Sequence, residues 1–61
     1  MFRKGDYIKY TGNSNKIKKG RIFKFHSYIN SIYLGAQSTE NKDNLFLYPS
    51  NDFELAFHID E

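Results

Sequence analysis

The chain has 61 residues, of which 18% are aromatic, 26% are charged and none is cysteine. This length allows one domain spanning residues 1–61, and the lack of cysteine excludes a disulfide framework and a thiolate metal site. The same lack of cysteine leads us to expect a location in the reducing cytoplasm. No apolar run approaches the roughly 20 residues of a membrane span or forms the core of a signal peptide, so we expect no membrane partner.

The net charge of +2 hides a strong asymmetry along the chain. Residues 1–24 carry eight basic side chains and one acidic side chain, whereas residues 40–61 carry one basic and six acidic side chains. This asymmetry fits a basic surface directed at phosphates or at an acidic protein. It fits equally a fold in which the two halves neutralise each other.

The composition also indicates an origin. Asn, Lys, Ile, Phe and Tyr, which have AT-rich codons, supply 30 of the 61 residues. A low-GC bacterium or one of its phages is the source that we expect from this codon bias.

Short apolar clusters separated by turn-forming residues run through the whole chain, and no long stretch keeps the apolar stripe of a helix. This pattern predicts an all-β protein, and strands at such regular spacing predict a closed or nearly closed small barrel. The five expected strands lie near residues 6–10, 20–26, 31–37, 44–48 and 53–57. A long basic loop, residues 13–19, should join the first two strands.

The first two strands differ in how well their inward face is defined. Alternation in the first strand places Ile8 inside and Tyr7 outside. In the second strand, Phe23 and Phe25 share a face, but a strand with a bulge that turned Ile22 and Phe25 to the same side would also fit. The sequence leaves both registers of the second strand open.

The later strands carry three further expectations. The segment 28–34 is apolar and poor in charge, so it is either buried or a contact strand for a partner, and we favour burial. The segment 49–52 has the length and residues of one 3-10 turn, which begins at a proline. In the last strand, Phe53, Leu55 and Phe57 share one face, which predicts a half-buried strand.

The start of the chain carries a glycine and aspartate before the first strand, a glycine after it, and a glycine that opens a second strand with apolar positions. The residues are Gly5, Asp6, Ile8, Gly12, Gly20, Ile22 and Phe25. This pattern resembles KOW-type SH3-like barrels, which occur in ribosomal proteins and transcription elongation factors. The closing Phe53-Glu54-Leu55 after a proline turn is similar to short SH3-like proteins of phages and prophages. The resemblance implies a five-stranded SH3-like barrel with a 3-10 turn before the last strand.

A cluster of basic residues next to aromatic residues is the main candidate binding site. Cations neutralise phosphates, and exposed rings stack on unpaired bases. The alternative is that the lysines solubilise a long loop while the rings form the core. The candidate residues are Tyr7, Lys9, Lys16, Lys18, Lys19, Arg21 and Lys24.

Catalytic and metal chemistry find little support in the sequence. His26 and His58 would approach each other if the second and fifth strands were neighbours, but no third ligand accompanies them. Asp52 and Glu54 resemble solvated charges rather than an acid and base pair. We therefore expect no enzyme activity, no cofactor and no metal site.

The leading functional hypothesis is a non-enzymatic binding module, a phage or prophage accessory protein that binds a host protein and modulates it. The alternative is binding of RNA or single-stranded DNA through the basic segment 16–24. A third hypothesis is an assembly role as a homo-oligomer, and both a monomer and a homodimer fit the sequence.

Overall fold

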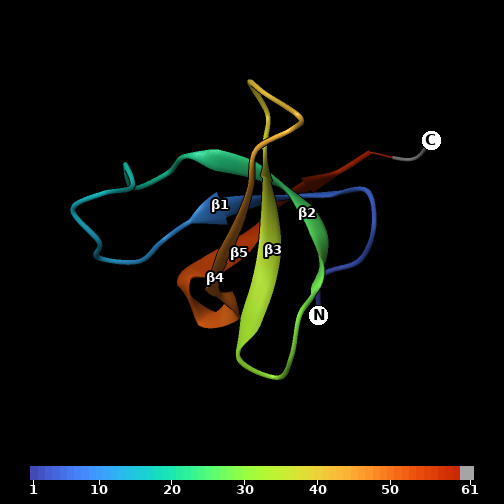
Figure 1. Ribbon diagram of the computed structural model, residues 1–61, viewed down its shortest axis with the longest axis horizontal. Helices are drawn as coiled ribbons and strands as arrows, with labels where there is room; N and C mark the ends of the chain where they lie inside the picture. The colour runs from blue at the N-terminus through green and yellow to red at the C-terminus, as the bar shows by residue number, and fades with distance from the viewer. Residues whose placement is uncertain (60–61) are drawn as a thin grey trace.

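The computed structural model describes residues 1–59, which form one antiparallel sheet and a single 3-10 turn, with no α-helix in this range (Figure 1). The all-β class and the 3-10 turn before the last strand are therefore confirmed. The elements are β1 (Asp6–Tyr10), β2 (Ile22–Tyr28), β3 (Tyr33–Ser38), β4 (Leu45–Pro49), η1 (Ser50–Asp52) and β5 (Phe53–His58).

The strands are ordered β4-β3-β2-β1-β5, so β5 returns to pair with β1 and leaves β4 and β5 at the two edges. Figure 1 shows a curled sheet in which β2 bends between the layer of β1 and β5 and the layer of β3 and β4. Within residues 1–59 no strand pairing joins β4 to β5. The sheet is thus open, and closure into a barrel stays a prediction.

The core lies on the concave face of the sheet and centres on Phe23. The side chains of Ile8, Phe23 and Leu34 are fully buried, which confirms the inward assignment of Ile8. The ring of Phe23 meets the rings of its neighbours edge to face at centroid distances of 5.7 to 6.2 Å, an arrangement that aromatic pairs prefer. These neighbours are Phe46, Tyr48 and Phe53.

The register of β2 follows the first of the two expected alternatives. Phe23 and Phe25 are both buried, whereas Ile22 is only half-buried. A bulge does occur, but it follows Phe25: the pairing with β3 skips His26. Because the extra residue comes after the two phenylalanines, it bends the strand without taking either of them out of the core.

The prediction that Phe53, Leu55 and Phe57 share one face is wrong for Phe57. Leu55 pairs with the inward-facing Ile8 and stays on the face of Phe53, but it lies on the edge strand, where the core does not cover it. Leu55 is 54% exposed and Phe57 is 47% exposed. The pairing with β1 shifts by one residue, because Ile8 faces Leu55 whereas Tyr7 faces Phe57. This bulge reverses the alternation, so Phe57 lies on the outer face with Tyr7 instead of below Phe53.

The prediction that segment 28–34 is buried is also wrong for most of its length. Leu34 is fully buried, but Ile29 and Ile32 are 49% and 60% exposed. The side-chain oxygen of Asn30 accepts hydrogen bonds from the backbone N–H groups of Ile32 and Tyr33, at 2.8 and 2.9 Å. This local turn reverses the chain between β2 and β3, so most of the segment is a turn and not a core strand.

Candidate functional site

The predicted basic loop joins β1 to β2 and is fixed at its base and in its middle. The N–H of Gly20 donates to the carbonyl of Tyr10 at 2.8 Å, and the N–H of Tyr10 donates to the carbonyl of Arg21 at 2.9 Å. Gly20 has a φ of +90°, a conformation that favours glycine. Ile17, from the middle of the loop, is only 8% exposed and joins the core cluster. These contacts hold the loop in place, and Figure 1 shows it extending away from the sheet.

The cations of this loop surround the buried Ile17. Lys16, Lys18 and Lys19 are exposed, and among the described residues no carboxylate forms an ion pair with them. The guanidinium of Arg21 lies 4.8 Å from the centroid of the Phe23 ring, within the range of a cation–π contact. Three lysines thus meet water, while the arginine is partly engaged with the core.

The other predicted residues lie apart from the loop, on the outer face of the sheet. Lys9 pairs with Glu54 at 3.0 Å in an exposed ion pair. The half-buried Tyr7 stacks on Phe57 at 4.8 Å, so one face of its ring is covered. Lys24 is half-buried and faces Tyr7 in the β1–β2 register. The predicted set therefore divides into a loop group and a sheet group.

A polar pocket of about 370 Å³ lies beside the sheet group. It contains two lysine side chains, one tyrosine ring and several neutral polar groups. The lining residues are Tyr7, Lys24, Gln37, Ser38, Thr39 and Lys42. Lys24 interacts with other parts of the chain, so this pocket is not a set of unengaged cations.

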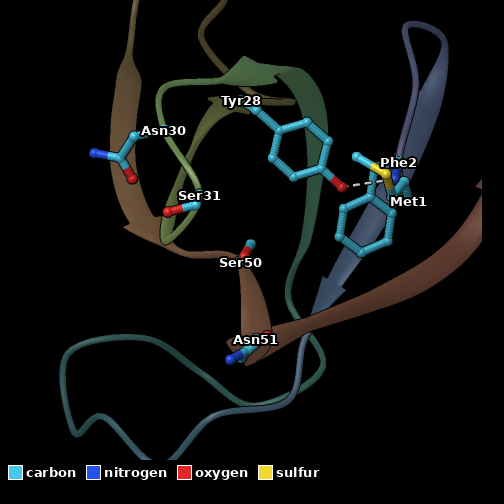
Figure 2. A pocket seen from close by; sticks show the side chains of 7 residues that line it. All are labelled: Met1, Phe2, Tyr28, Asn30, Ser31, Ser50 and Asn51. Atoms are coloured by element: carbon cyan, nitrogen blue, oxygen red, sulfur yellow. Dashed lines mark hydrogen bonds between the residues drawn. The ribbon is translucent and has the colours of Figure 1, made fainter.

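A second pocket, of about 490 Å³, lies between the N-terminal segment, the β2–β3 turn and η1 (Figure 2). The hydroxyl of Tyr28 accepts a hydrogen bond from the N–H of Phe2 at 2.7 Å, and the two rings stack at 6.5 Å. The lining residues are Met1, Phe2, Tyr28, Asn30, Ser31, Ser50 and Asn51. This set has amide and hydroxyl groups but no His, Asp, Glu or Lys side chain that could act as a general acid or base.

The β3–β4 hairpin carries an apolar surface patch that was not predicted from the sequence. We call it the hairpin patch and define it as Tyr33, Leu45, Leu47 and Pro49. Tyr33 is 42% exposed, Leu45 is 47% exposed and Leu47 is 59% exposed. The strand register brings these side chains to one outward face, because Tyr33 pairs with Pro49 and Gly35 pairs with Leu47. Neither β3 nor β4 contains a charged residue. Alternating leucines in segment 44–48 were the available signal, since Phe46 and Tyr48 already supply an inward face.

Two histidines serve local structure. β1 lies between β2 and β5, so the strand neighbourhood that would bring His26 close to His58 is not present. His26 hydrogen-bonds to the hydroxyl of Ser27, and His58 to the carboxylate of Asp6. Residues 1–59 contain no group of three or more His, Asp or Glu side chains placed to hold a metal ion.

Comparisons with protein-family models, with curated proteins and with solved structures found no match for this chain. Residues 1–59 also contain no helix with the length and apolar character that crossing a membrane requires.

Proposed function

We propose that this chain is a non-enzymatic protein-binding module that uses the hairpin patch. The observation that carries the proposal is the exposure of three large apolar side chains on one uncharged face of adjacent strands. Contiguous apolar patches on small proteins mark interaction sites, because exposed apolar surface lowers its free energy when a partner covers it. Full burial of a leucine side chain contributes about 1.5–3 kcal/mol, so covering half-exposed Leu45 and Leu47 supplies roughly half that amount each.

The proposed partner is a host protein, and the proposed role is that of a cytoplasmic phage or prophage accessory protein that modulates it. The codon bias of the sequence supports the phage origin. The 490 Å³ pocket is lined by no His, Asp, Glu or Lys side chain, and this lining supports a role without catalysis.

For the fold, we propose an SH3-like barrel with a KOW-like first half. Two features support it: a meander from β1 to β4 whose last strand, β5, returns to pair with β1, and the 3-10 turn between β4 and β5. Gly12 and Gly20 flank the loop between β1 and β2, in the order that the KOW resemblance implies.

The test compares capture of proteins from a nuclease-treated lysate of a low-GC bacterium by three immobilised chains. These are the wild type, the double variant Leu45→Glu with Leu47→Glu, and the control Leu55→Glu. Leu55 is as exposed as the two patch leucines but lies on β5. We expect a stoichiometric partner with the wild type and the control and its loss with the double variant. Equal capture by all three chains would contradict the use of the hairpin patch.

A second candidate function is binding of RNA or single-stranded DNA by the basic loop. The observation that favours it is the exposure of Lys16, Lys18 and Lys19 without a carboxylate partner among the described residues. Fluorescence anisotropy with short RNA and DNA should show an affinity whose logarithm falls with the logarithm of salt, by about 0.7 for each phosphate neutralised.

The double variant Lys18→Glu with Lys19→Glu should abolish this binding, whereas Lys9→Glu, on the sheet, should weaken it only slightly. Lack of binding by the wild type at low salt would remove the nucleic-acid function.

A further inference from the structure

The free edge of β4 presents unpaired backbone groups at two residues, Leu45 and Leu47. The N–H of Ser38 donates to the carbonyl of Asn44 at 2.9 Å, and the N–H of Ser50 donates to the carbonyl of Ile32 at 2.8 Å. Hydrogen-bonded residues alternate along an antiparallel strand. The backbone N–H and C=O groups of the even-numbered residues of β4 therefore point to β3. The N–H and C=O groups of Leu45 and Leu47 therefore point to the open side, where the described residues offer them no backbone partner.

This edge lacks the features that usually prevent pairing between sheets. Edge strands are commonly protected by charged residues, bulges or an early proline. Residues 44–51 carry no charge, the β3–β4 pairing is regular, and Pro49 is the last residue of the strand. The opposite edge, β5, has two of these features, since it contains the charged Glu54 and a bulge.

We propose that β4 pairs with β4 of a second copy of this chain, antiparallel and about a two-fold axis at Leu47. In this register the two Leu47 residues exchange both backbone hydrogen bonds. The N–H of Leu45 in each copy donates to the carbonyl of Pro49 in the other. Because Pro49 lies at the end of the strand, its missing N–H costs only the last bond on each side.

The side chains and charges are compatible with this symmetric register. Phe46 of one copy lies beside Tyr48 of the other on the inner face, an aromatic pair of the kind that stabilises adjacent strands. The paired strands themselves carry no charge, since residues 44–51 contain no Lys, Arg, Asp or Glu. No two charges of the same sign therefore meet within the paired segment.

Pairing at this edge has a consequence for the outer surface. It brings the two hairpin patches side by side on one face of a ten-stranded sheet, so that a partner protein meets a surface twice as wide. A two-fold contact between identical edges also closes, whereas pairing of β4 with β5 of the next copy would continue into a ring or a fibre.

The test measures the oligomeric state by light scattering and sedimentation over a wide concentration range. We expect the wild type to dimerise and Leu47→Pro to raise the dimer dissociation constant by at least about ten-fold, because each copy loses the N–H that points to its partner. The matched control is Leu47→Ala, which keeps the backbone donor and should still dimerise. A wild type that stays monomeric at a concentration of about 1 mM would overturn the proposal, as would a dimer unaffected by Leu47→Pro.

Nuclear magnetic resonance of the wild type gives a second test that needs no variant. In a mixture of labelled and unlabelled chains, the Hα atoms of Phe46 and Tyr48 from different copies should show a cross-peak, because non-hydrogen-bonded pairs have close Cα atoms. A dimer without this cross-peak would use another surface. A failed dimer would leave the binding of a host protein by single chains intact, so the two proposals fail separately.

Discussion

The imidazole of His58 and the carboxylate of Asp6 join the last residue of β5 to the first residue of β1. His58 Nδ1 lies 2.5 Å from Asp6 Oδ1, and Asp6 is only 4% exposed. The other carboxylate oxygen, Oδ2, accepts the backbone N–H of Arg3 at 2.9 Å. One buried side chain thus fixes the N-terminal turn and the C-terminal strand together.

This arrangement predicts acid sensitivity. The backbone N–H of Arg3, followed by His58, lowers the pKa of Asp6 below its usual value of 3.8, although burial acts in the opposite direction. Since the folded state favours the ionised carboxylate, its stabilisation is complete above the pKa of the unfolded chain. It is lost as the pH falls from about 3.8 through the lower folded value.

We expect Asp6→Asn to melt at a lower temperature than the wild type at pH 7. The difference should shrink as the pH falls below 3.8, because the wild type then loses the same charge. Thermal unfolding followed by circular dichroism at several pH values measures this convergence. Melting curves that stay equally far apart down to pH of about 2 would contradict the assigned role.

A side chain at position 12 should destabilise the fold, because the atoms around Gly12 leave no room for it. A Cβ atom at Gly12 would lie 2.6 Å from Cζ of Tyr10 and 2.9 Å from Cγ of Asp52. The Tyr10 hydroxyl also accepts the N–H of Ser14 at 2.9 Å, so its displacement would disturb the loop. We expect Gly12→Ala to destabilise the chain by about 1–3 kcal/mol, as overpacking does.

The matched control is Gly35→Ala. Its Cβ would meet no atom closer than 3.5 Å, and its φ is not positive. Chemical denaturation should show this variant to be at least as stable as the wild type, because alanine restricts the unfolded chain. Equal losses for the two variants would indicate a general glycine effect and not the close contact at Gly12.

Ile17 should anchor the basic loop. Its side chain is 8% exposed and packs in the core cluster, while neighbouring Lys18 is exposed. We expect Ile17→Ala to cost about 2–4 kcal/mol and Lys18→Ala less than about 0.5 kcal/mol. Denaturant midpoints measure both. A loss below about 0.5 kcal/mol for Ile17→Ala would show that the loop does not depend on this contact.

Sequence periodicity predicted those parts of the fold that depend on local alternation. The strand 6–10 with Ile8 inside and the 3-10 turn after Pro49 follow from such local signals, and both are confirmed. Periodicity could not place the bulges in β2 and β5, because a bulge is set by the pairing of two strands far apart in sequence. One such shift is enough to turn Phe57 to the outside.

The candidate site shows the same limit. Charge counting found Lys16, Lys18 and Lys19 and identified an exposed loop, but the cover that Phe57 gives to Tyr7 depends on register. The buried Ile17 was also missed, since a single isoleucine among lysines has no periodicity to indicate burial. The exposure of Tyr7 and Ile17 depends on tertiary contacts. The residue pattern of a single strand does not contain this information.

The shifted register of β5 makes a last prediction about two side chains of similar exposure. Phe57 stacks on Tyr7 across the strand pair, whereas Leu55 has no place in the core cluster. Phe57→Ala should therefore cost about 0.5–1.5 kcal/mol, the worth of an aromatic pair, and Leu55→Ala less than about 0.5 kcal/mol. Unfolding by urea, with the slope checked for constancy, measures both. If β5 kept an unbroken alternation, Phe57 would lie on the inner face with Phe53, and its truncation would instead cost about 2–5 kcal/mol, as that of a buried side chain does.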